Sequence, residues 1–142
     1  MTVDNKTLIH RWFEEVWNQG RADTIDELLA DECVVHGLAD ASGNEVRGPA
    51  EFRAFHAQFR EAFPEIVVTV EDAISEGDLV AARCSVSGKH KGDSLGFKAT
   101  NAPVEFTGMS IVRVKDGKFV EGWNNFDFLK MYQQLGHQLQ QS

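Results

Sequence analysis

The periodicity of apolar residues changes from helical to alternating at Pro64, and this change limits the folds that the chain can adopt. Before Pro64, in residues 8–17 and 52–63, apolar side chains recur at the spacing typical of helices packed on a core. From Ile66 onward apolar and polar residues alternate, which is typical of strands. Helices followed by a run of strands favour an α+β fold with a mostly antiparallel sheet.

The helical part divides at residues that begin or end helices. Asp4 can cap a first helix that Gly20 ends, and Asp23 can cap a short second helix. Pro49 suits the first position of a third helix, and Pro64 ends it.

The strand part consists of alternating segments separated by turns. Asp116–Gly117 predicts a tight turn that joins the last two strands as a hairpin. A short helix from Phe128 to Leu135 follows. Residues 38–48 are expected to be a loop or a loose hairpin, and residues 91–102 a loop. The expected strands cover residues 33–36, 66–74, 79–90, 104–115 and 118–126.

A sheet curved around the phenylalanine-rich third helix would leave a cone-shaped space between them. We therefore expect one α+β domain over residues 1–142, in which a curved, mostly antiparallel sheet wraps around the N-terminal helices as a cone with an apolar cavity. The composition of ten Phe and three Trp with one Tyr suits a large apolar core or an apolar pocket.

The bulk properties exclude several classes of protein. The net charge of −8 and the lack of a basic stripe argue against a nucleic-acid partner. No apolar run has the length of a membrane span, and residues 1–5 contain neither a basic cluster nor an apolar signal core, so a cytoplasmic location is expected. Cys33 and Cys84 lie in apolar stretches and are expected to be small buried residues.

No standard catalytic motif occurs in the sequence, and the histidines show no metal-ligand spacing. We therefore expect neither a metal nor a cofactor. What remains is a small set of polar residues in apolar surroundings.

Asp127 is the first of these polar residues. It continues the odd-numbered face of the strand 118–126, which carries Glu121, Trp123 and Asn125. If this face looks into the cavity, Asp127 is a carboxyl group at the cavity's end. The alternative is an N-cap for the helix that begins at Phe128. A cap lowers a carboxyl pKa and an apolar lining raises it, so the sequence leaves both roles open.

Arg83, His36 and His90 are the other polar candidates, and each also has an ordinary structural explanation. Arg83 lies in a strand, where it either pairs with a carboxylate or faces solvent. His36 and His90 end strands, where a histidine is usually exposed or locally hydrogen-bonded. A functional role is favoured for all three if their side chains lie at the mouth of a cone.

Apolar and amide side chains are candidates for substrate binding. Phe55, Phe59 and Phe63 of the third helix fall near one face, which is either plain core or a cavity wall. From the sheet, Met109, Trp123 and Asn125 are expected to contact the substrate.

Taken together, these stretches resemble the SnoaL-like polyketide cyclase family, and its ester-cyclase branch in particular. The similarity covers nearly the whole chain, in matching order and spacing. The stretches that carry it are residues 13–20, 33–36, 48–52, 80–92, 116–127 and 133–136.

The resemblance implies a cone of the nuclear-transport-factor-like or ketosteroid-isomerase-like type, usually a homodimer, with cofactor-free acid/base chemistry inside it. Asp127 matches the family's acid/base aspartate near the end of the last strand, and His36, Arg83 and His90 match polar positions that recur in the ester-cyclase branch. The chain departs from the branch in residues 93–103, which lack a Pro-Thr-Gly step and so put substrate choice in doubt. It also departs at Lys89, where a Thr is usual.

The leading hypothesis is therefore an enzyme that enolises and closes an aromatic or polycyclic carbonyl compound, with Asp127 moving a proton and His36 or Arg83 orienting the substrate. A non-catalytic dimeric cone that binds a small molecule is the alternative from another class. Ketosteroid isomerisation is disfavoured because the one Tyr, Tyr132, lies in the last helix. An epoxide hydrolase would need a third member beside Arg83 and Asp127, and none is evident.

Overall fold

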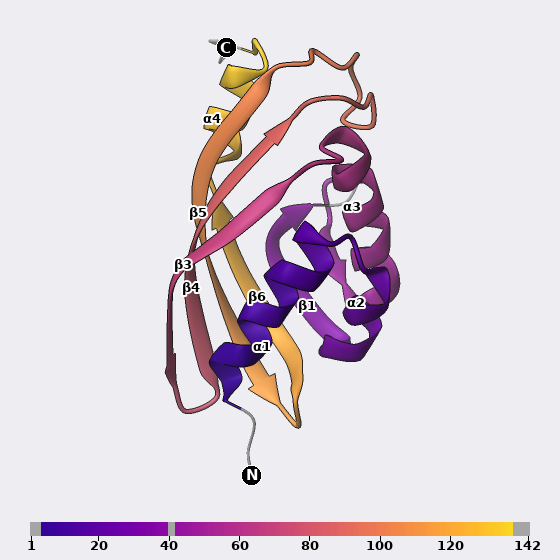
Figure 1. The fold of residues 1–142 in the computed structure, drawn as a ribbon. Helices are drawn as coiled ribbons and strands as arrows, with labels where there is room; N and C mark the ends of the chain where they lie inside the picture. Colours follow the sequence, from indigo (N-terminus) through magenta and orange to yellow (C-terminus); the bar gives the residue numbers. More distant parts are fainter. Residues whose placement is uncertain (1–3, 40–41, 138–142) are drawn as a thin grey trace, which may run out of the picture.

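The architecture is a curved sheet with helices packed on its concave side (Figure 1). The structure is a computed structural model, and it describes residues 4–39 and 42–137. Within these residues the six-stranded sheet has the order β2-β1-β6-β5-β4-β3, and every neighbouring pair is antiparallel except β1 and β6. The strands are β1 (Leu29–Ala39), β2 (Glu45–Arg47), β3 (Val67–Glu76), β4 (Leu79–Lys89), β5 (Pro103–Lys115) and β6 (Lys118–Phe126).

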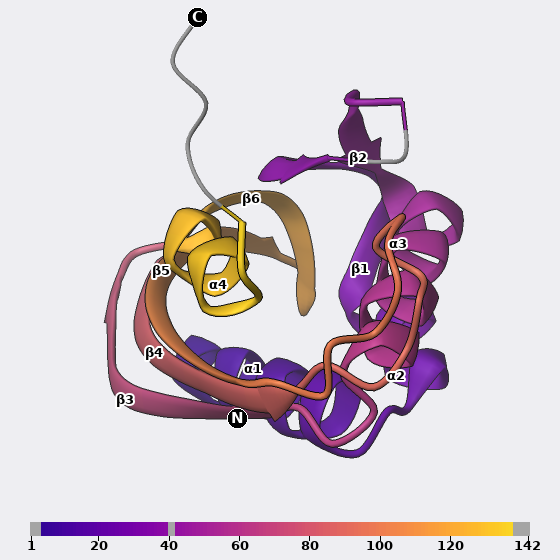
Figure 2. The same cartoon turned by 90° about the horizontal axis from the view of Figure 1, so that it is seen from above.

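The helices cover the inside of the curve. Seen from above, the sheet curls so that α1, α2 and α3 lie on its concave side, while α4 lies at the end where the described chain finishes (Figure 2). The α+β cone expected from the sequence is therefore confirmed. The helices are α1 (Asn5–Arg11), the π-helix η1 (Trp12–Asn18), α2 (Ala22–Leu28), α3 (Gly48–Ala62) and α4 (Phe128–Gln134).

The first helix differs from the expectation, because its second half is a π-helix. The wider turn of η1 ends with the Gln19 N–H bonded to the Glu14 carbonyl, 2.9 Å away. Side chains of α3 bond to two carbonyl groups of η1. His56 Nε2 lies 2.7 Å from the Val16 oxygen, and the Arg60 guanidinium donates to the Trp17 carbonyl over 2.6 Å. These bonds fix η1 against α3.

Aromatic side chains from η1 and α3 form the core beneath the sheet. The rings of Trp12 and Phe52 have centroids 5.0 Å apart, and those of Trp17 and Phe59 are 5.8 Å apart. All four side chains are buried. Burial of this apolar surface holds the helices on the concave face.

Strand β1 is longer than the expected 33–36, because it begins at Leu29 directly after α2. It pairs in parallel with β6, so that His36 lies opposite Trp123. The two strands lie close together at Gly37, whose φ is +85° and where a Cβ would lie 1.9 Å from the Asn124 carbonyl oxygen. Only glycine fits this position.

Replacing Gly37 by Ala should therefore destabilise the protein strongly. Gly43 has nearly the same φ, +83°, but nothing lies within 4 Å of its added Cβ, so Gly43→Ala is the matched control. We expect Gly43→Ala to cost about 1 kcal/mol of unfolding free energy and Gly37→Ala at least about 2 kcal/mol more. Urea denaturation measures both values, and equal costs would show that no close strand contact exists at Gly37.

Candidate active site

An apolar cavity lies between the concave face of the sheet and the helices. It contains about 730 Å³ of space not filled by atoms, counting its opening to solvent. The helical side of its wall is aromatic, with Trp12 and Trp17 of η1 and Phe55 and Phe59 of α3. Phe128 joins the wall from the start of α4, its ring centroid 6.2 Å from that of Phe59. A lining of this kind suits an apolar ligand.

The sheet side of the wall comes from β1, β3, β4, β5 and β6. In the two central strands, the lining residues are Phe106, Ser110 and Val112 of β5 and Phe119, Gly122, Asn124 and Phe126 of β6. Phe126 lies directly over Gly108, where an added Cβ would come within 2.2 Å of its ring. The glycine therefore makes room for an aromatic side chain in the wall.

A β-bulge in β6 decides which of its side chains face the cavity. Before the bulge Phe119 pairs with Val114, and after it Glu121 pairs with Arg113. The extra residue, Val120, shifts the alternation by one position. Phe119 therefore points inward, but beyond the bulge the even-numbered side chains do so.

The condition set for Asp127, that the odd-numbered face of this strand looks into the cavity, is therefore not met beyond the bulge. Trp123, Asn125 and Asp127 lie on the outer, convex face, together with Met109 of β5 and Arg83 of β4, and line a second, open pocket there. Among the expected binding residues, Phe55 and Phe59 do line the cavity, whereas Met109, Trp123 and Asn125 do not.

Asp127 caps α4 and faces solvent. Its carboxylate accepts the backbone N–H of Lys130 over 3.0 Å, and the side chain is exposed. Asp is well suited to this N-cap role. The geometry supports the cap that the sequence left open, and a catalytic role for Asp127 stays a prediction.

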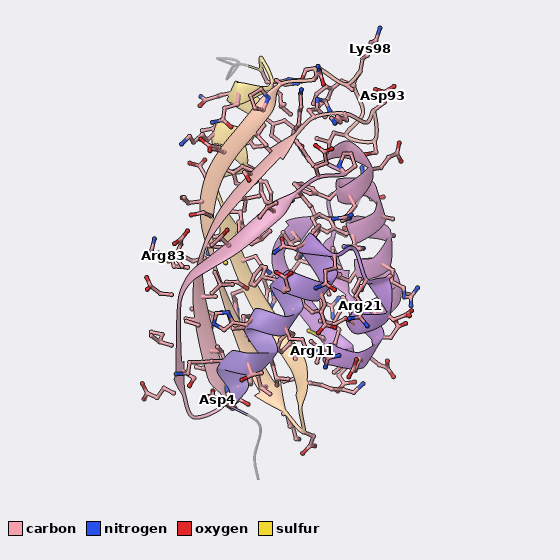
Figure 3. The ribbon with its side chains drawn as sticks, in the orientation of Figure 1. Asp4, Arg11, Arg21, Arg83, Asp93 and Lys98 are labelled. Carbon is pink, nitrogen blue, oxygen red and sulfur yellow. The ribbon has the colours of Figure 1, made fainter. Side chains whose placement is uncertain are left out.

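Arg83 is also on the outer side of the sheet. Its guanidinium lies 2.7 Å from the Asp72 carboxylate of β3, and both side chains are more than half exposed. Figure 3 shows Arg83 pointing away from the helices. The structure thus places Arg83 in a surface ion pair rather than at the cavity.

His36 joins three strands on the outer face. Its Nε2 lies 2.8 Å from the Glu121 carboxylate of β6, its Nδ1 contacts the Glu45 carboxylate of β2, and its ring stacks on Trp123 with centroids 5.7 Å apart. The hydrogen bonds with Glu121 and Glu45 raise the pKa of His36 above its ordinary value of about 6.5.

His90 is buried beside the loop that follows β4, outside the wall of the cavity. The backbone N–H of Thr100 donates to Nδ1 over 3.1 Å, so the ring hydrogen lies on Nε2. That Nε2 has no hydrogen-bond partner within the described part of the chain. Phe63 packs on the same ring, with centroids 5.6 Å apart, and so lies behind the wall rather than in it.

Two polar side chains in the wall were missed by sequence reasoning, Ser110 and Asn124. They lie directly opposite each other on β5 and β6, and the Ser110 hydroxyl donates to Asn124 Oδ1 over 3.0 Å. Asn124 Nδ2 in turn donates to the His36 carbonyl over 3.1 Å. A signal existed in the sequence, because Ser110 interrupts the otherwise apolar even-numbered face between Phe106 and Val112.

Cys33 of β1 is the one titratable side chain among the described residues that line the cavity. Burial, with a smaller contribution from Glu121, raises the pKa of its thiol to about 12. The thiol therefore stays protonated at neutral pH and is a poor nucleophile or base. Over residues 4–39 and 42–137, no group of three or more His, Cys, Asp and Glu side chains could hold a metal ion.

The fold and the cavity define a class, the cone-shaped α+β domains that hold a small molecule between sheet and helices. The sequence model of the SnoaL-like polyketide cyclases matches residues 7–135. The chain therefore belongs to the SnoaL-like polyketide cyclase family, and it is a small-molecule enzyme of the cyclase type.

Relatives within the family support this assignment. The aklanonic acid methyl ester cyclases DauD of Streptomyces sp. strain C5 and DnrD of Streptomyces peucetius are each 30% identical over 123 residues, covering 86% of this chain and 76% and 84% of their own. IdmH from Streptomyces antibioticus has a crystal structure that is similar with a TM-score of 0.81 at 32% identity, over 95% of this chain and all of that one.

The stacked and paired environment of His36 predicts a pH-dependent stability. Because its pKa is raised in the folded state, His36 stabilises the protein fully below the unfolded value of about 6.5, and this contribution is lost as the pH rises through the folded pKa. We expect the free energy of unfolding of His36→Gln to fall less than that of the wild type as the pH rises above about 6.5. Urea denaturation across this range tests it, and parallel curves would contradict it.

Two substitutions separate the possible roles of Asp127. Asp127→Ala removes the cap and should cost about 1 kcal/mol of unfolding free energy, whereas Asp127→Asn keeps a good cap and should cost little. From its position we expect Asp127→Asn also to keep turnover of polyketide-like esters. A large loss of turnover in Asp127→Asn at unchanged stability would restore the catalytic role.

Proposed function

We propose that this protein closes a ring in an apolar, aromatic carbonyl compound of the polyketide type, bound in the cavity between sheet and helices. The observation that carries the proposal is the cavity itself, whose wall is aromatic on the helical side and apolar nearly throughout, with Ser110 and Asn124 as its polar side chains. The names of the related aklanonic acid methyl ester cyclases support an ester of an aromatic polyketide as the substrate class.

The cavity would act mainly by positioning. A flexible carbonyl compound reacts with itself slowly because few of its conformers bring the reacting carbons together. Rigid walls from Trp12, Trp17, Phe55 and Phe59 would hold the molecule folded, and such positioning is a large source of rate enhancement. No metal, cofactor or covalent intermediate is part of this proposal.

Ligand binding without turnover is the alternative that the sequence left open, and the cyclase relatives argue against it. One observation favours it: Asp127 caps α4 and faces solvent, so the residue expected to move protons does not reach the cavity. Conversion of a bound ester to an isomeric product distinguishes the two candidates.

A homodimer is also part of the proposal. Met109 and Ile111 of β5 are 58% and 42% exposed on the outer face of the sheet, and Trp123 lies beside them. Exposed apolar side chains that gather on one face are typical of a protein interface, and a second copy of this chain would cover them.

No helix within the described ranges is long and apolar enough to cross a membrane, and the cytoplasmic location expected from the sequence stays a prediction.

Narrowing the cavity should abolish binding without unfolding the protein. A Cβ added at Gly122 would lie 3.6 Å from Val112 Cγ1, an ordinary contact, and the methyl groups of Gly122→Val would extend into the cavity. We expect at least about a tenfold loss of affinity for aklanonic acid methyl ester, measured by quenching of tryptophan fluorescence, with a matching loss of turnover measured by chromatography.

The control for this experiment is Asn125→Val, which adds a branched side chain to the outer face of the same strand. We expect Asn125→Val to bind the ester like the wild type. Equal binding by Gly122→Val and the wild type would show that the ligand lies elsewhere.

A further inference from the structure

The cavity wall offers few hydrogen bonds. Apart from the indole N–H groups of Trp12 and Trp17 and the Cys33 thiol, the side chains of the described lining residues can form them only at Ser110 and Asn124. This pair lies on the central strands of the sheet, opposite the aromatic wall formed by the helices. A polar group on a bound ligand would therefore be oriented mainly by these two residues.

The hydrogen bonds that Ser110 and Asn124 already form determine which donors and acceptors remain for a ligand. The His36 carbonyl can only accept, so it fixes Nδ2 of Asn124 on its side and turns Oδ1 toward Ser110, whose hydroxyl must then donate. One hydrogen of Asn124 Nδ2 and the lone pairs of Ser110 Oγ remain without a partner among the residues that the structure describes. The pair thus presents one donor and one acceptor side by side.

The wall around this pair carries no charge. Its described residues include no Asp, Glu, Lys, Arg or His, and the Cys33 thiol stays protonated because burial raises its pKa to about 12. An anion in this apolar space would lack a counter-charge and would be strongly disfavoured. The cavity therefore selects neutral ligands and contains no side chain able to act as a base at neutral pH.

We propose, building on the function proposed above, that Asn124 and Ser110 bind the substrate as the neutral enol of a 1,3-dicarbonyl compound. The free Nδ2 hydrogen of Asn124 donates to the carbonyl oxygen, and the enol hydroxyl donates to Ser110 Oγ. A 1,3-dicarbonyl compound enolises readily on its own, so the cavity needs no base to form the nucleophile. This places Ser110 and Asn124 as residues that determine specificity for the enol.

Ring closure from this bound form balances without a charged side chain. The enol carbon forms a carbon–carbon bond with a second carbonyl carbon of the same molecule, and the electrons of that carbonyl move to its oxygen. The enol oxygen becomes a carbonyl and loses its proton, while the new alkoxide oxygen gains one. The product is an isomer of the substrate, and no residue of the wall changes its charge.

A series of three bicyclic probes tests the anchor by isothermal titration. 2-Acetyl-1-tetralone has a neutral enol beside a carbonyl, 1-tetralone has the carbonyl alone, and naphthalene has no oxygen. We expect the wild type to prefer the diketone to naphthalene by about tenfold, with 1-tetralone between them. Asn124→Leu should remove this preference, and Ser110→Ala should reduce the diketone to the level of 1-tetralone.

The preference is the ratio of the affinities for the diketone and for naphthalene, measured in each variant. A general loss of affinity affects both probes and so cancels in this ratio. Ser110→Ala is a small change and keeps the test valid if Asn124→Leu folds poorly, while Asn125→Leu is the matched control on the outer face and should keep the wild-type ratio. An unchanged ratio in Ser110→Ala and in any folded Asn124→Leu would overturn the proposal.

The ionisation state of the bound diketone gives an independent readout. Above the pKa of the free diketone, the ultraviolet spectrum of the bound fraction should remain that of the enol, and the affinity should fall as the pH rises. A bound enolate spectrum would overturn the proposal.

The outcomes also separate this proposal from the one on which it rests. If naphthalene binds and Gly122→Val weakens it, but the diketone is not preferred, the cavity is the binding site and only the anchor fails. If Gly122→Val changes the binding of none of the three probes, the cavity itself is not the site, and both proposals fail.

Discussion

The curvature of the sheet around the aromatic faces of η1 and α3 is the constraint on which the rest of the structure depends. A strongly curved sheet has a concave face that must be covered, and the π-helical turn aims Trp12 and Trp17 toward it. His56 and Arg60 of α3 then form hydrogen bonds with two carbonyl groups of this turn. Because rigid rings do not fill a cone completely, an apolar space remains between helices and sheet.

The β-bulge in β6 separates two chemically different faces. Outside the sheet, His36 and Arg83 pair with carboxylates where water still reaches them, and Asp127 caps a helix. Inside, Ser110 and Asn124 hydrogen-bond to each other in an uncharged wall. This division keeps ionised side chains out of the cavity wall, so the cost of burying charge there is avoided.

Much of the fold could be predicted from local sequence, because its signals act over a few residues. The change of period at Pro64, the Pro49 helix start and the Asp116–Gly117 turn all mark elements that the structure contains. The π-helix and the first half of β1 could not be predicted, because contacts with α3 and pairing with β6 decide them. In the candidate site, Phe55 and Phe59 could be predicted, because a helix keeps its spacing along its whole length.

The sequence by itself determined the family, the cone and the kinds of side chain available, since these depend on composition, order and spacing. Only the tertiary structure decided which side chains meet in the cavity. An alternating strand has two equivalent faces, and one extra residue at Val120 exchanges them, so Asn124 rather than Asp127 reaches the inside. That exchange depends on how β6 pairs with β5, and the sequence of β6 alone does not determine this pairing.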